Sequence, residues 1–107
     1  MIAPPVPRRG ELWLARLDKQ RPVVVLTRDP LGSHLHSVIV GPVTSTSRGL
    51  STEVAVGPED GARISSVVNL DNLQLLDRRR LIRRVGHLRA DTLRRVCEAA
   101  AIAIGCA

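Results

Sequence analysis

Aromatic side chains are almost absent from this chain of 107 residues: Trp13 stands alone, with no Phe and no Tyr. Modules such as RNA-recognition motifs and OB folds hold nucleic acid by stacking its bases on exposed aromatic rings. One tryptophan cannot build such a platform. Any binding of nucleic acid by this chain must therefore use guanidinium groups, hydroxyl groups and backbone amides.

Lysine is also nearly absent, since Lys19 accompanies 15 arginines among the 16 basic residues. Against 10 acidic residues, these give a formal net charge of +6. The planar, forked guanidinium group suits phosphate better than an ammonium group does. The composition favours a polyanionic partner, either nucleic acid or an acidic protein segment. A genome with arginine-rich codon usage would produce the same bias.

Cysteines and long apolar runs are scarce as well. Cys97 and Cys106 are too few for the disulfide framework of a small secreted domain, and a zinc site would need paired ligands elsewhere. The opening sequence MIAPPVPRRG lacks the pattern of a signal peptide, and the apolar tail at 99–107 is too short to span a bilayer. We therefore expect a cytoplasmic protein that does not associate with membranes.

Short strand-like runs follow one another closely after a proline-rich opening, which we expect to be a flexible lead at residues 1–9. The run PVVVLT at 22–27 is continuous and β-branched, which is typical of a strand buried on both faces. Its proline is expected to open the strand. Further strands are expected at 11–17, 37–43, 52–56 and 64–70, with a short sixth strand at 85–88.

The end of the chain predicts helix. Residues 77–84 read as a short helix or 3₁₀ segment, and residues 91–104 place Leu93, Val96 and Ala100 on one apolar stripe at helical spacing. Frequent strands with short turns argue for antiparallel pairing. We expect a single domain at 10–107, mostly β, built as a small antiparallel barrel with a C-terminal helix.

Two places suggest a phosphate site. Arg21 precedes the most apolar strand, which would anchor its guanidinium group at the strand mouth. The hydroxyl cluster TSTS at 44–47 follows another strand and precedes Arg48 and Gly49. Small hydroxyl groups beside a glycine and an arginine can bind a phosphate with little steric cost. A plain polar turn has the same composition.

Other candidates have simpler alternatives. His34 and His36 would share one face of a strand, but two histidines lack the further ligands that a metal requires. The basic run that includes Arg78, Arg79 and Arg80 is dense enough for a phosphate or acidic-partner surface. A solvated face explains it equally well.

Five segments share an order and a spacing with a known family. They are GELW at 10–13, RPVVVLT at 21–27, VGPVTST at 40–46, SVVNLDN at 66–72 and RRVGHL at 83–88. Together they resemble the MazF/PemK family of toxin endoribonucleases, across residues 10–105. Five motifs in one register make the resemblance specific.

The resemblance implies an SH3-like barrel that forms a homodimer, cleaves single-stranded RNA at short sequences and is silenced by a cognate MazE-like antitoxin. Such enzymes need no metal and no cofactor. They use the ribose 2′-hydroxyl as nucleophile and leave 2′,3′-cyclic phosphate and 5′-hydroxyl ends. The catalytic arginine and threonine of the family fall on Arg21 and Thr44. RNA binding is then expected from Ser45, Thr46, Arg48, Asn69 and Asp71, with a structural role as the alternative for Asp71.

Departures from the family pattern matter too. Asn69 stands where the PemK-like branch has an arginine, which favours the arrangement of Arg21 with Thr44. The loop at 17–20 is shorter than in many relatives, so their cleavage specificity cannot be transferred. For proton transfer, His34 and His36 are the candidates nearest in sequence. The alternative function is a non-catalytic SH3-like module that binds nucleic acid or an acidic protein.

Overall fold

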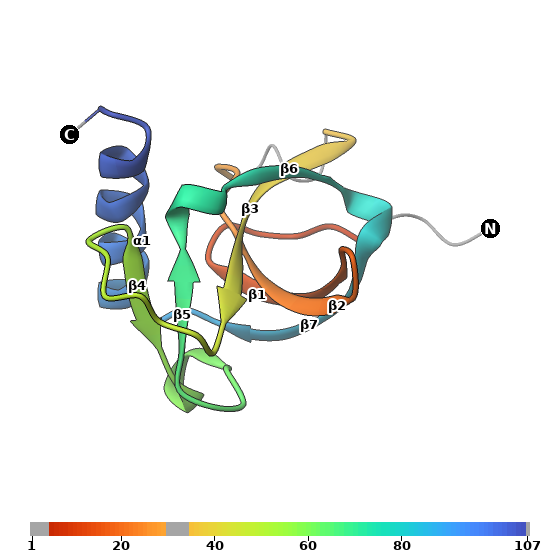
Figure 1. The fold of residues 1–107 in the computed structure, drawn as a ribbon. Helices are drawn as coiled ribbons and strands as arrows, with labels where there is room; N and C mark the ends of the chain where they lie inside the picture. The colour runs from red at the N-terminus through yellow and green to blue at the C-terminus, as the bar shows by residue number, and fades with distance from the viewer. Residues whose placement is uncertain (1–4, 30–34, 107) are drawn as a thin grey trace.

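A computed structural model describes residues 5–29 and 35–106 of the chain, which form a curled sheet with one helix beside it (Figure 1). The strands of this part are β1 (Glu11–Arg16), β2 (Gln20–Val25), β3 (Ser37–Thr44), β4 (Glu53–Val56), β5 (Ser66–Asn69), β6 (Gln74–Asp77) and β7 (Leu81–His87). Short 3₁₀ turns lie at η2 (Pro58–Asp60), η3 (Leu70–Asn72) and η4 (Arg78–Arg80), and the helix is α1 (Ala90–Ala103). The expected mostly β fold with a C-terminal helix is confirmed.

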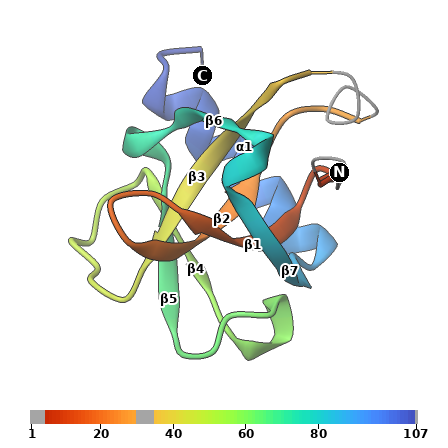
Figure 2. The ribbon, with the colours of Figure 1, turned by 90° about the vertical axis from the view of Figure 1, so that its right-hand side faces the viewer.

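The strands pair antiparallel in the order β4-β5-β3-β2-β1-β7, with β6 paired to β3 beside this path. Strand β3 is long enough for two partners along one edge, because its first half pairs with β6 and its last two residues pair with β5. The sheet curls as a result (Figures 1 and 2). Among the described strands the barrel is not closed by a further ladder, since β4 and β7 end the path.

Strand β2 is buried on both faces, as its sequence predicts. Val24 belongs to the apolar cluster that contains Leu12, while Val23 and Val25 belong to a second cluster with Ala15. None of these five side chains is exposed to solvent. Because a fully buried valine contributes roughly 1.5–3 kcal/mol, β2 is the central support of the domain.

The expected beginning of β2 is wrong by two residues. The strand starts at Gln20, and Pro22 is its third residue, opposite Leu14 of β1. The proline is tolerated there because pairing of β2 with β3 begins only at Val23. Arg21 therefore lies inside a hydrogen-bonded hairpin and not in the loop before it.

The segment before the helix also differs from expectation. Only residues 78–80 of the expected helical stretch at 77–84 are 3₁₀, and β7 begins at Leu81. The sequence does not predict strand β6 at all. This strand has a single buried residue, Leu76, while its neighbour Leu75 is 72% exposed, so its sequence has no buried run to mark it.

The motif GELW at 10–13 has a structural role, because its Glu11 connects two strands. The carboxylate of Glu11 is buried and accepts hydrogen bonds from Arg8 N (2.7 Å), Trp13 Nε1 (3.1 Å) and Arg84 NH1 (3.0 Å). Burial alone would raise the pKa of Glu11, but these donors outweigh it and lower that pKa below its ordinary value. One carboxylate thus ties β1 to β7.

Residues 5–9 pack on the domain. Pro7 is fully buried, the carbonyl of Pro5 accepts a hydrogen bond from Arg78 Nε (2.7 Å), and Arg9 N donates to Asp29 Oδ1 (3.0 Å). The packed part of the described chain therefore reaches back to Pro5, and the flexibility of the lead stays a prediction.

Helix α1 stands beside β4, across the molecule from β2 (Figure 1). It buries Val96 and Ala99, with Leu93 and Ala100 packed against the same cluster, so the expected apolar stripe is confirmed. Across the described residues, no helix has the length and apolar character needed to cross a membrane.

Candidate active-site groove

An open groove of about 660 Å³ runs across the ends of several strands. Its lining comes from two parts of the fold: the β1–β2 hairpin with β7, called here the near wall, and the end of β3 with the loop between β4 and β5, called here the far wall. The lining residues are Leu14, Gln20, Arg21, Pro22, Val43, Thr44, Ser45, Gly61, Ala62, Arg63, Ile64, Ser66, Arg83 and Val85. This set has three arginines, four other polar side chains and no carboxylate.

The register of β2 and β3 brings Arg21 and Thr44 to this groove together. Val23 is opposite Pro42 in the ladder, so continuing the register by two residues places Arg21 opposite Thr44. The β2–β3 ladder ends at Val23 and Pro42, two residues before that point, while the last two residues of β3 stay paired to β5 on the other edge of the strand. The two strands separate where both side chains reach the groove.

The guanidinium group of Arg21 is held in place by the hairpin. Its Nε lies 3.4 Å from Asp18 Oδ1, and the Arg21 side chain is 34% exposed. The pKa of Asp18 lies below its ordinary value because the backbone N–H of Lys19 donates to it, with the charge of Arg21 adding to the effect. A carboxylate that stays ionised keeps the Arg21 group oriented.

Thr44 and Ser45 supply hydroxyl groups on the opposite wall. Thr44 Oγ1 accepts a hydrogen bond from Thr46 N (3.2 Å), which holds the chain in a tight turn after β3. Ser45 is exposed. The acceptor role of Thr44 leaves its own hydroxyl proton available to a ligand.

Glu53 organises the loop that follows. Its carboxylate accepts hydrogen bonds from Arg48 N (3.0 and 3.1 Å), Leu50 N (3.1 Å) and Ser47 Oγ (3.3 Å). These donors, the N–H of Leu50 foremost, lower the pKa of Glu53. Neither Thr46 nor Arg48 lines the groove, so both lie beyond its rim.

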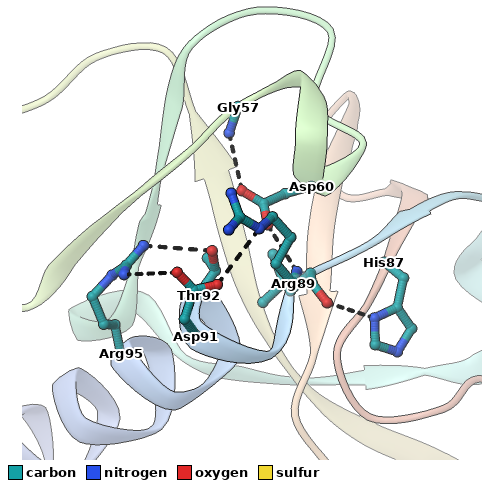
Figure 3. A network of polar contacts seen from close by, with 8 residues as sticks. Gly57, Asp60, His87, Arg89, Asp91, Thr92 and Arg95 are labelled. Carbon is teal, nitrogen blue, oxygen red and sulfur yellow. Dashed lines mark hydrogen bonds and ion pairs between the residues drawn. The ribbon is translucent and has the colours of Figure 1, made fainter.

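The far wall is anchored by Asp60, whose side chain is buried (Figure 3). Its Oδ2 accepts from Gly57 N (3.3 Å) and its Oδ1 from Arg89 N (2.9 Å), the residue before helix α1. One carboxylate therefore closes the η2 turn and satisfies a backbone donor at the start of the helix. Around it, Asp91 lies within ion-pair distance of Arg89 (3.6 Å) and Arg95 (3.5 Å).

The loop between β4 and β5 crosses β7 where Gly61 meets Gly86. A Cβ atom on Gly61 would lie 2.5 Å from the Cα of Gly86, and the reverse is equally true. Gly61 also has a φ of +95°, which favours glycine. The crossing fixes the position of the chain that leads into Arg63.

The chain that carries this groove matches a known protein family. Residues 8–104 match the family described as PemK-like, MazF-like toxin of type II toxin-antitoxin system. The chain belongs to this family.

Individual MazF proteins are similar along most of their length. Endoribonuclease MazF3 of Mycobacterium tuberculosis is 46% identical over 79 residues, which covers 74% of this chain and 77% of that protein. The structure of Mycobacterium tuberculosis toxin MazF-mt6 superposes with a TM-score of 0.85 and 41% identity, over 89% of this chain and 96% of that one. An endoribonuclease in complex with its cognate antitoxin from a Mycobacterial species gives a TM-score of 0.86 and 28% identity, over 92% and 95% of the two chains.

In this MazF-like chain, Asn69 and Asp71 have structural partners. Asn69 Oδ1 accepts from Asp71 N (3.0 Å) and caps η3, while Asp71 Oδ2 accepts from Thr52 Oγ1 (2.5 Å). Asn69 is the last residue of β5 and Asp71 lies in η3, whereas Ser66, the β5 residue that lines the groove, is at the other end of the strand. These hydrogen bonds connect η3 to the end of β5 and to Thr52, the residue before β4, and contact of Asn69 and Asp71 with RNA stays a prediction.

The two candidate histidines are not brought to the groove by the described structure. His34 lies outside the described residues. His36 precedes the first residue of β3 and Thr44 is the last, so the two are about 25 Å apart at 3.3 Å per residue. His36 lines a separate cleft with Asp77, Arg78 and Arg79.

The basic run of the MazF-like chain is engaged with its own backbone and side chains. Arg78 donates from Nε to Pro5 O (2.7 Å) and from NH1 to Leu35 O (3.2 Å), which holds two segments together. Arg79 binds Asp77 through Nε (3.2 Å) and NH2 (2.8 Å). Arg79 and Arg80 are exposed. A role of this run in binding phosphate or an antitoxin stays a prediction.

The pair of Asp77 and Arg79 gives a pH-dependent prediction. Hydrogen bonds from the Arg79 side chain, together with one from the Arg79 backbone N–H, lower the pKa of Asp77 from 3.8 to about 2. Since the folded value is the lower one, the pair stabilises the fold above pH 3.8 and loses that effect as the pH falls toward 2. Arg79→Ala should raise this pKa part of the way to 3.8, because the Arg79 N–H remains. NMR titration of the Asp77 carboxyl carbon measures this pKa. An unchanged midpoint in Arg79→Ala would show that the Arg79 side chain does not lower it.

Arg63 and Arg83 are groove residues for which the sequence predicted no catalytic or RNA-binding role. Arg63 follows a turn with two glycines, and Arg83 is the first residue of the RRVGHL motif within the basic stretch, where nothing distinguishes it from its neighbours. Their placement in the groove depends on the contact between Gly61 and Gly86, and no pattern in the sequence predicts that these two glycines meet. Once that crossing is known, both arginines fall on one groove.

Proposed function

We propose that this chain is the toxin of a type II toxin–antitoxin pair, an endoribonuclease that cleaves single-stranded RNA at short sequences without a metal. The observation that carries the proposal is the meeting of Arg21 and Thr44 in a groove without carboxylates, in a member of the MazF-like family. We further propose that it acts in the cytoplasm as a homodimer.

The proposed reaction is attack of a ribose 2′-hydroxyl oxygen on the adjacent phosphorus atom. The bond from phosphorus to the 5′-oxygen breaks, which leaves a 2′,3′-cyclic phosphate and, after protonation, a 5′-hydroxyl. The transition state carries additional negative charge on the phosphoryl oxygens. A fixed guanidinium group from Arg21 and a hydroxyl donor from Thr44 stabilise that charge.

Proton transfer needs a group other than these two. A guanidinium group holds its proton throughout the working pH range and is a poor base, so Arg21 acts by charge. His34 and His36 stay the candidates from the sequence. Because the described site places no histidine in the groove, a water molecule or a group on the RNA itself fits the described geometry better.

Thr44→Ala is expected to slow cleavage by about 10- to 100-fold. The loss should be smaller than for a charged donor, because hydrogen bonds from ionised groups are roughly twice as strong. Thr44→Ser keeps the hydroxyl group and should retain most of the rate. Single-turnover cleavage of one RNA by the three proteins measures this, and equal rates for Ala and wild type would remove Thr44 from the site.

The test of the whole proposal is cleavage of a long single-stranded RNA by the purified chain in EDTA, with chemical identification of the new ends. Cuts at one recurrent short sequence with 2′,3′-cyclic phosphate ends support it. A folded protein that binds RNA without cutting would favour the second function, a non-catalytic SH3-like module.

The proposed inhibitor is a MazE-like antitoxin with an acidic, partly disordered segment. Such a segment can fold on binding and lie along a basic groove. The arginines that bind RNA would then also bind the antitoxin, which makes the two ligands exclusive. Competition of RNA against an acidic antitoxin peptide in a binding assay tests this.

A further inference from the structure

Three arginines share the groove, and the proposed chemistry uses one of them. Arg63 and Arg83 line it beside Arg21, and both are exposed. Within residues 5–29 and 35–106, neither Arg63 nor Arg83 has an ion pair with a carboxylate. Two positive charges with no carboxylate paired to them make the potential of the groove positive, which attracts an anionic ligand.

The positions of the two side chains are set by the fold. Arg83 is opposite Leu14 in the β1–β7 ladder, and Leu14 is opposite Pro22 in the β1–β2 ladder. At about 4.8 Å per strand, this row places the backbone of Arg83 about 10 Å from that of Pro22, next to Arg21. Arg83 and Arg21 therefore stand at different points along the groove.

Arg63 reaches the groove from the loop between β4 and β5. Two residues before it, Gly61 is pressed against Gly86 of β7, and one residue earlier Asp60 is bonded to the N–H of Arg89 (Figure 3). Because these contacts already order the backbone near Arg63, the position of its Cα is fixed, and binding a ligand costs little further backbone entropy. The anchoring network is thus a support for Arg63.

We propose that Arg63 and Arg83 bind the RNA phosphates that flank the scissile one, so that three arginines follow the backbone of a single strand through the groove. This assignment rests on the proposed function. It makes both residues substrate-positioning residues that act on binding, whereas Arg21 acts on the transition state. A groove that tracks phosphates with cationic side chains suits a chain that has almost no aromatic residues for base stacking.

The experiment measures binding of a non-cleavable 2′-O-methyl oligoribonucleotide at several salt concentrations, together with cleavage kinetics of the matching RNA. Arg63→Ala and Arg83→Ala should each weaken binding about 10-fold. Each should also reduce the slope of log K against log salt by about 0.7, the value for one contact with a single strand. KM should rise in each variant while kcat changes little.

Two variants serve as controls. Arg94→Ala removes an exposed arginine of α1 that does not line the groove and should leave the slope unchanged. Arg63→Lys keeps the charge and should restore the slope. If wild type binds and cleaves RNA while Arg63→Ala and Arg83→Ala behave like Arg94→Ala, this assignment is overturned and the endoribonuclease stands. If wild type neither binds nor cleaves RNA, the proposed function itself fails.

Discussion

Arg21→Ala is expected to cleave RNA about 10²–10³-fold more slowly than wild type, the loss typical of removing one preorganised donor from a site of developing negative charge. The reason lies in the hairpin that holds the residue. Asp18 Oδ1 lies 3.4 Å from the Nε of the guanidinium group, and this ion pair favours one orientation of the group before RNA arrives. Alanine removes the charge and the alignment together.

The expected pattern separates charge from geometry. Arg21→Lys keeps a positive charge but loses the planar fork, and should recover only part of the rate. Asp18→Ala leaves the guanidinium group in place with more freedom and should cost less than Arg21→Ala. Single-turnover rates under saturating enzyme measure these effects on the chemical step.

The thermal midpoint of each variant shows whether a loss of rate reflects the site or a loss of folding. Arg21 is half-buried and Asp18 is exposed, so both variants should keep the thermal midpoint of wild type within a few degrees. A folded Arg21→Ala protein that cleaves at the wild-type rate would exclude Arg21 as the catalytic arginine. Arg63 and Arg83, which share the groove, would then be the remaining arginines able to stabilise the transition state there.

Local sequence patterns predict the core elements well. Strand β2 is readable because an unbroken β-branched run has one physical use, a strand covered on both faces. Helix α1 is readable from its apolar stripe, to within one residue of its observed ends. Strand β6 is not readable, since it gains its pairing from β3 and buries little of its own side chains.

The site is predictable only where its residues belong to known motifs. Arg21 and Thr44 lie 23 positions apart, and their meeting depends on the register between β2 and β3, which the family motifs preserve. Arg63 depends on a contact between two glycines that carry no side chain to reveal it. His36 shows the opposite error, because nearness in sequence suggests a place beside the site while a full strand separates it from Thr44.

Gly86→Ala is expected to lower the free energy of unfolding by about 1–3 kcal/mol, the usual cost of forcing extra atoms into a packed interior. The new Cβ would lie 2.5 Å from the Cα of Gly61 and 2.8 Å from the carbonyl oxygen of Asp60. Both neighbours are backbone atoms that cannot rotate away. For a domain of this size, the change corresponds to a fall in Tm of about 4 °C or more.

The same substitution should reach the groove. Relief of the clash requires the loop at 57–66 to move away from β7, which weakens the hydrogen bond from Arg89 N to Asp60 and displaces Arg63. Gly86→Ala should therefore weaken RNA binding at temperatures where the protein is still folded, and should do so less in an Arg63→Ala background. Gly105→Ala is the control for a glycine substitution without a clash, because no atom lies within 4 Å of the point that a Cβ would occupy there. Gly105 has a φ of +78° and Gly86 has no positive φ, so any loss in Gly105→Ala comes from backbone strain, which does not arise at Gly86. Equal Tm and RNA affinity for Gly86→Ala and wild type would show that the two segments do not approach this closely in solution, and the support assigned to Arg63 would fall with that contact.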